Sequence, residues 1–173
     1  MGDTYDKKQF PNSGYFYLLS FETSQDILGG QISFSKYFAK FGTYHTIGWF
    51  TAHGWTLGGN IGGMPPFFER FTIGKENRLW GFRGDELIGD NVFNAGLDLR
   101  VNFRGRLKRL YVISGVAMGN IWSKDVPWKQ SKTIWSAGAG LGLETPIGPL
   151  QILWGLSNMK TQYLHAELGY QFE

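Results

Sequence analysis

The chain has 173 residues, of which 17% are aromatic and 18% charged, with 25 glycines, no cysteine and a formal net charge of +3. This composition excludes a disordered chain, which would be poor in aromatic residues, and it disfavours a helical bundle, because glycine weakens helices. The lack of cysteine excludes disulfides, thiolate zinc sites and cysteine nucleophiles, and the small, scattered positive charge argues against a nucleic-acid partner.

Residues 1–13 are predicted to form an N-terminal tail. They lack the apolar core of a signal peptide, so we expect a mature sequence from which such a peptide has been removed. Less regular strands are predicted next over 14–23, 28–41 and 43–57. A tight turn is expected at Gly42-Thr43, and a phase change near Lys36 predicts a bulge or a twist.

A long connection over 60–90 follows the third strand, and five further strands follow it. Their main signal is an alternation of apolar and polar residues with a period of two. It is cleanest over 91–104, where one face is Phe93, Ala95, Leu97, Leu99, Val101 and Phe103, and the other is Asn94, Gly96, Asp98, Arg100, Asn102 and Arg104. The remaining strands are predicted over 108–121, 135–144, 150–156 and 164–172.

These elements predict an all-β fold: an eight-stranded antiparallel transmembrane β-barrel over 14–173, with a long plugging loop after strand 3. An even strand count lets such a sheet close, and the short and long connections fall on opposite sides, as in outer-membrane barrels. Aromatic residues near strand ends are typical of interfacial girdles. They are Tyr15, Tyr17, Trp55, Phe103, Trp135, Tyr170 and Phe172.

The alternative is a soluble lipocalin-like barrel, in which the apolar face points inward. Here the apolar face is bulky and aromatic, whereas the opposite face combines glycine with charged residues, which favours a polar interior in a membrane barrel. Glycine in strands marks a close approach by other groups, so we expect the loop to pack Trp80 and Phe82 against a glycine wall. The glycines predicted to face inward are Gly48, Gly54, Gly96, Gly115, Gly119, Gly138, Gly140, Gly142, Gly155 and Gly169.

The inward charged residues are interpreted as an ion-pair network that holds the barrel together. They are Asp98, Arg100, Glu144, Glu167 and His165. No catalytic residue, metal ligand or cofactor is predicted. His45 and His53 are expected to share one face of one strand at the membrane interface, and neither a G-x-S-x-G nor an H-E-x-x-H motif occurs.

Three segments resemble the bacterial surface-antigen barrels, which include the BamA and TamA assembly barrels and the barrel of patatin-like phospholipase autotransporters. The chain resembles this last barrel more than it does the assembly barrels. The first is SAGAGLGLETPIGPLQI (136–152), similar to that family's penultimate hairpin. The second is GNIW (119–122), and the third is FFERFTIGKENRLWGFRGDEL (67–87), which resembles the loop that folds into the lumen. The resemblance covers about the last two thirds of the chain and corresponds to the C-terminal half of a sixteen-stranded barrel.

The resemblance implies a loop motif whose members are Trp80, Gly81, Phe82, Arg83, Gly84, Asp85 and Glu86. In assembly members an arginine of this motif reaches a lumenal aspartate. This chain has Trp80 and Ala117 at those two positions, so both partners are replaced together. Arg83 is expected to pair instead with inward Asp98, Glu144 or Glu167. The implied lumenal partners are Asp98, Arg100, Ala117, Gly138, Gly140, Gly142, Glu144 and Glu167.

The function that these features predict is that of a minimal outer-membrane barrel without periplasmic repeats, which perturbs the bilayer, assists membrane-protein insertion or serves lipid homeostasis. One alternative is a passive anchor equivalent to the barrel of a patatin-like phospholipase, and a less favoured one is a lipid-modifying barrel enzyme. The expected partners are outer-membrane lipids, client barrel proteins and a second copy paired seam to seam. The seam prediction involves Gly169, Tyr170 and Phe172 in the last strand.

Overall fold

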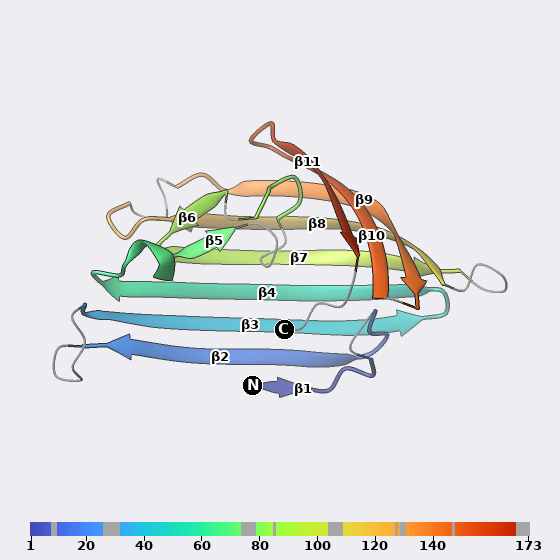
Figure 1. Ribbon diagram of the computed structural model, residues 1–173, viewed down its shortest axis with the longest axis horizontal. Coiled ribbons are helices and arrows are strands. Elements are labelled where there is room, and N and C mark those ends of the chain that lie inside the picture. The colour runs from blue at the N-terminus through green and yellow to red at the C-terminus, as the bar shows by residue number, and fades with distance from the viewer. Residues whose placement is uncertain are drawn as a thin grey trace.

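The computed structural model describes residues 1–7, 10–25, 32–73, 79–84, 86–103, 109–126, 128, 131–146 and 148–168. They form one antiparallel sheet of nine strands, in the order β1-β2-β3-β4-β7-β8-β9-β10-β11, and a small sheet β5-β6 (Figure 1). The elements are β1 (Gly2–Asp3), β2 (Gly14–Ser24), β3 (Phe34–Ile47), β4 (Phe50–Gly63), the 3-10 helix η2 (Phe67–Glu69), β5 (Phe71–Ile73), β6 (Leu87–Gly89), β7 (Asn91–Asn102), β8 (Leu110–Trp122), β9 (Ile134–Thr145), β10 (Gly148–Ser157) and β11 (Gln162–Leu168). Among these residues, no helix is long and apolar enough to cross a membrane.

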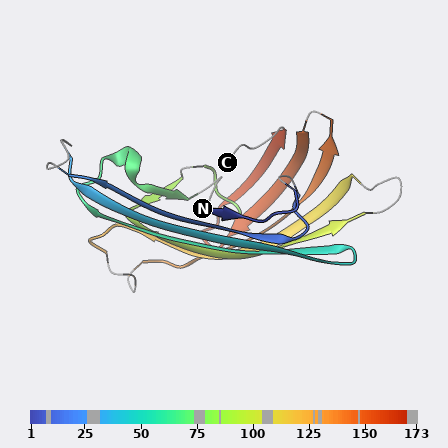
Figure 2. The ribbon, with the colours of Figure 1, turned by 90° about the horizontal axis from the view of Figure 1, so that it is seen from below.

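The prediction of an all-β, antiparallel fold is confirmed. The eight predicted strands correspond to β2, β3, β4, β7, β8, β9, β10 and β11. Three short strands were not predicted: β1 extends the sheet beside β2, and β5 and β6 form a hairpin within the long loop. Side chains of that loop cover the concave inner face of the sheet, which Figure 2 shows as a curved trough.

The outer face of the sheet is apolar, whereas the inner face combines buried polar side chains with the apolar core. In β7, Asn94 is 0% exposed, whereas Leu97 on the opposite face is 47% exposed. A strand alternates its side chains between two faces, and the inner face of β7 also carries Asp98 and Arg100, both buried. The result is an outer surface of bulky apolar residues suited to lipid and an inner surface that buries polar groups beside the core.

Buried apolar side chains inside the trough form the core. Leu57 and Ile61 of β4 and Ile134 of β9 contribute from the sheet, and Ile73, Leu79 and Phe82 come from the long loop. The loop therefore supplies much of the apolar core, because the glycines on the inner face of the sheet have no side chains to contribute.

Closure of eight strands into a barrel is not found. Within the described residues, the sheet ends at β1 on one side and at β11 on the other, and no pairing joins β11 to β1 or β2. An even number of antiparallel strands permits closure but does not impose it, so the strand count alone does not determine whether the sheet closes.

The predicted turn at Gly42-Thr43 is wrong. β3 continues to Ile47, and the chain turns at Gly48, whose φ of 65° lies in the left-handed region. Gly42 lies inside β3, where a Cβ would lie 2.9 Å from the Tyr5 hydroxyl. Gly42 therefore marks a close approach by the N-terminal segment.

Two further predictions about this region are wrong because the turn lies at Gly48, and the predicted bulge is also not found. His45 and His53 lie on different strands, with His45 exposed and His53 buried. Gly54 alternates with the buried Trp55, so Gly54 faces outward and Trp55 inward. The bulge near Lys36 is absent, since the pairing of β3 with β2 and β4 runs through Lys36 without a break. The predicted turn at 104–107 lies outside the described residues apart from the strand ends that flank it.

Candidate functional site

The loop segment 79–84, called the plug segment below, docks on the inner face of β8, β9 and β10. The ring of Trp80 covers Gly115 and Gly138: a Cβ at Gly115 would lie 2.9 Å from the indole nitrogen, and one at Gly138 would overlap the ring. Gly81 has a φ of 82°, and a side chain there would also meet the backbone of Leu156 at 2.9 Å. Glycine on both surfaces thus allows the main chain of the plug segment to approach the sheet.

Hydrogen bonds attach Trp80 to the wall at the positions where the resemblance places an ion pair. The Trp80 backbone N–H donates to the Ser136 hydroxyl over 3.1 Å, and that hydroxyl donates to the Ala117 carbonyl over 3.5 Å. Ala117 itself is buried in the core. Packing and neutral hydrogen bonds therefore hold the loop against the sheet at the two positions where assembly relatives are expected to have an arginine–aspartate ion pair.

The rest of the loop motif lies toward the end of the trough formed by β10 and β11. The Arg83 guanidinium lies 5.5 Å from the ring of Tyr163 on β11, and its backbone N–H donates to the Glu86 carboxylate over 2.9 Å. Gly84 is exposed in the turn between them. Asp85 lies outside the described residues.

A buried polar cluster lies on β4 and β7 next to the plug segment. Oδ2 of Asp98 lies 3.1 Å from Nδ1 of His53 and accepts a 3.1 Å hydrogen bond from the Trp55 indole N–H. The His53 ring stacks on Tyr44 of β3 with ring centroids 4.0 Å apart. Asp98 thus joins neighbouring strands and contacts the wall glycine Gly115.

The described residues of the N-terminal segment, 1–7 and 10–13, enter the trough from the end of the sheet that carries the β3–β4 turn, called the turn end below. The Arg100 guanidinium donates to the carbonyl oxygens of Phe10 and Pro11, over 3.0 and 2.7 Å, and to the Asn12 side chain over 2.8 Å. The ring of Phe10 stacks on Tyr111 with centroids 4.6 Å apart. Arg100, predicted as part of an ion-pair network, instead acts mainly as a clamp on backbone oxygens.

Asp6 closes the turn that precedes this clamp. Its carboxylate accepts hydrogen bonds from the backbone N–H groups of Asn12 and Ser13, over 2.7 and 3.1 Å. Slight burial raises the pKa of Asp6, but these donors outweigh it and hold the pKa below its ordinary value.

The clamp predicts that an Arg100→Met variant releases the N-terminal segment while keeping an apolar stem. Hydrogen bonds to a charged donor contribute roughly 1.5–3 kcal/mol each. We expect the backbone amides of Thr4 and Asp6, which donate to Tyr15 and Ser13, to exchange with deuterium at least about tenfold faster. Hydrogen exchange followed by mass spectrometry measures this rate. An Arg109→Met variant changes an exposed arginine at the same end and is the control; equal exchange in both variants contradicts the clamp.

The other predicted inner-face residues are spread along β9, β10 and β11. The Tyr111 hydroxyl donates to Glu144, and Glu167 lies 3.3 Å from His165 on the same strand. Gly142 faces the Phe10 ring, while a Cβ at Gly140 would strike the backbone of β10. The seam residues Gly169, Tyr170 and Phe172 lie outside the described residues.

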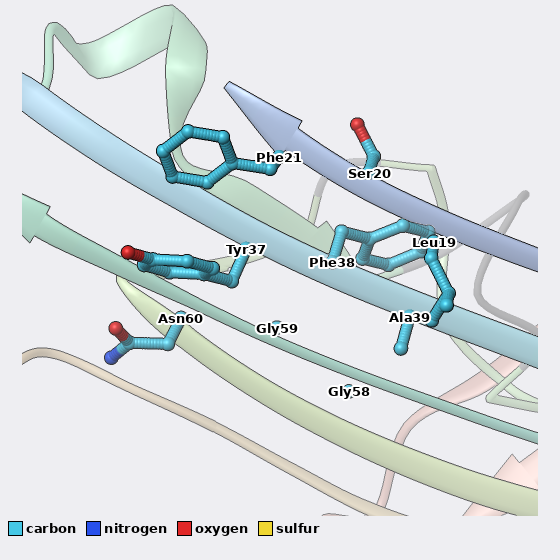
Figure 3. Close-up of a pocket in the computed structure, with 9 residues that line it drawn as sticks. All are labelled: Leu19, Ser20, Phe21, Tyr37, Phe38, Ala39, Gly58, Gly59 and Asn60. Atoms are coloured by element: carbon cyan, nitrogen blue, oxygen red, sulfur yellow. The ribbon is translucent and has the colours of Figure 1, made fainter. Parts of the chain in front are cut away.

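The outer face carries a shallow groove of about 630 Å³ across β2, β3 and β4 (Figure 3). Its floor includes Ala39 and Gly58, and a Cβ at Gly58 would meet other atoms only at 3.8 Å or more, so no close contact requires glycine there. The aromatic residues Phe21 and Tyr37 are more than half exposed beside it. The groove is therefore an apolar hollow on the side of the sheet suited to lipid.

Two parts of this site were not predicted from the sequence. The role of Trp55 and His53 as partners of Asp98 was missed because the β3–β4 turn was misplaced. The N-terminal insertion was missed because residues 1–13 show no alternation. Among the described residues, no group of three or more His, Asp or Glu side chains is arranged to hold a metal ion.

Comparisons with known proteins identify the family and the fold. A family model described as the Omp85 superfamily domain matches residues 2–173. In a comparison with curated proteins, none matches this chain. The structure is similar to that of BamA from Haemophilus ducreyi lacking POTRA domains 1–3, with a TM-score of 0.77 and 16% sequence identity. That match covers 95% of this chain and 39% of the other, so this chain spans well under half the length of that protein.

Proposed function

This chain belongs to the Omp85 superfamily, and on that premise we propose that it is an outer-membrane protein that disturbs the local bilayer and thereby assists the insertion of other membrane proteins. The observation that carries this proposal is the pair of sheet edges at β2 and β11, which no strand joins in the described part of the chain, apart from the short β1. Unpaired backbone groups are costly in lipid, so such edges disorder nearby lipid or accept another strand.

The outer-face groove supports the same proposal. It lies on β2, β3 and β4, beside the β2 edge, and it interrupts an otherwise convex apolar surface. Lipid chains against such a surface pack less regularly than against a smooth one. The docked plug segment stiffens the inner side of the sheet. The sheet therefore keeps its shape, and it is the packing of the lipid chains that is distorted.

The test is the folding rate of a urea-denatured client barrel into liposomes that contain this protein. We expect folding to be about tenfold faster than with an unrelated eight-stranded barrel at equal density, which corresponds to about 1.4 kcal/mol off the barrier. A Trp80→Ala variant is expected to lose much of this gain, since it loosens the plug segment.

Two controls make the result specific. The unrelated barrel accounts for the disturbance that any embedded protein causes. A Phe68→Ala variant removes an aromatic side chain that is 80% exposed in the same loop, and it is expected to keep the acceleration. A rate equal to that of the unrelated barrel would exclude assisted insertion and favour the passive-anchor alternative.

A further inference from the structure

We propose that the two open edges of the sheet pair with those of a second copy of this chain, so that two sheets of this kind close one barrel. Figures 1 and 2 show β2 and β11 along the two rims of the trough. The inference rests on the membrane placement proposed above. It describes the resting state of the edges, and an edge acts on lipid or on a client strand only where its seam opens, so the inference is tested without any client protein.

Physical chemistry requires a partner for these edges in a membrane. Backbone N–H and C=O groups have no water to bind in the hydrocarbon region, so sheets that span it are closed. In the described part of the chain, β11 is the last strand in the sheet order, and β1 covers only Phe16 and Tyr17 of β2. The remainder of the β2 edge, from Leu18 to Ser24, has no neighbouring strand there.

The edges of two copies are complementary in direction. β2 runs from the turn end of the sheet to the opposite end, where the long loop leaves β4 and which we call the loop end. β11 runs in the reverse direction, from the loop end to the turn end, as the antiparallel order of the eight long strands requires. A twofold axis along the trough therefore brings β2 of each copy antiparallel to β11 of the other. Both seams form at once, and the assembly closes as a symmetric dimer, the commonest oligomer.

The alternation of faces restricts the register. Leu19 and Phe21 of β2 are exposed on the outer face, as are Leu164 and Leu168 of β11, and these residues must stay on the same side across a seam. The register that pairs Phe21 with Ala166 meets this condition, places six of the seven residues of β11 opposite β2 and stops short of β1.

This register also matches charge on the inner face. It places Glu22 of one copy opposite His165 of the other, and an acid opposite a histidine is a favourable cross-strand pair. The short β1 then lies in line with the partner's β11 along the same edge of β2. The N-terminal segment would thus complete the seam at the turn end.

The experiment uses engineered disulfides, because the chain contains no cysteine of its own. A Phe21→Cys chain and an Ala166→Cys chain that carries an extra tag are folded together in lipid bilayers and oxidised. We expect a covalent product that contains one chain of each kind, whereas either single-cysteine chain alone gives none. Denaturing gels without reductant, followed by mass spectrometry, identify the product.

A chain with both Phe21→Cys and Ala166→Cys separates the dimer from self-closure. The dimer gives a species of twice the mass of one chain, whereas eight strands that close on themselves give a monomer with an internal disulfide. The control chain carries Phe21→Cys and His165→Cys, which lie on opposite faces and should not link. An internally linked monomer overturns the proposal, and so does the absence of any link in chains whose circular dichroism shows folded sheet.

Discussion

A Gly138→Val variant is expected to displace the plug segment and to lower the free energy of unfolding by about 1–3 kcal/mol, the usual range for overpacking a filled site. A Cβ at this position would overlap the Trp80 ring, and the indole cannot move deeper because it already covers Gly115. Valine is otherwise favoured in strands, and Gly138 has no positive φ, so the substitution does not strain the strand itself. The loss therefore reports on Trp80 alone.

The measurement is urea unfolding of the lipid-embedded protein, with hydrogen exchange of residues 79–84 as a local readout. Adding Trp80→Ala to Gly138→Val is expected to recover part of the stability, because the smaller side chain makes room for valine. This coupling is the specific sign of contact between the two residues. Gly62→Val is the control, since Gly62 faces outward and a Cβ there meets nothing within 4 Å. Equal losses in Gly138→Val and Gly62→Val would contradict the docking of Trp80.

The sequence predicts β7 to β11 to within a few residues, because each alternates bulky apolar residues with glycine or polar residues. The β3–β4 hairpin was mispredicted for a local reason. Gly42-Thr43 has the composition of a turn, whereas the real turn at Gly48 lies in the apolar run Ile47–Phe50. Only the left-handed φ of Gly48 distinguishes the observed turn from the predicted one, and a sequence pattern does not reveal a backbone angle.

The candidate site shows the same limit at longer range. Inward Asp98 and docked Trp80 follow from alternation and from the glycine wall. The partners of Asp98 depend on which face of β4 is inward, and one misplaced turn reversed that assignment for His53 and Trp55. Insertion of Phe10 beside Tyr111 joins residues about a hundred positions apart, and no periodicity records such a contact.

Removal of the Asp98 carboxylate has the second large expected effect. In an Asp98→Ala variant, the Trp55 indole and the His53 ring both lose an acceptor that lies 3.1 Å away. Removing the acceptor of a buried donor costs about 1–3 kcal/mol, and two donors are affected here, so the expected cost is about 2–6 kcal/mol. We expect a loss of this size in the free energy of unfolding, together with weaker stacking of His53 on Tyr44, which the Asp98 contact orients.

Substitution by asparagine separates charge from hydrogen bonding at this position. Asp98→Asn keeps one oxygen that accepts from Trp55 or His53, so its expected loss is about half that of Asp98→Ala. The control is Asp125→Asn at an exposed carboxylate, which should change stability by less than about 0.5 kcal/mol. Equilibrium unfolding in urea measures the free energy of unfolding of the three variants and ranks them by it. If Asp98→Ala were as stable as the Asp125 control, the cluster would not hold β4 to β7, and the inner wall would depend on the plug segment alone.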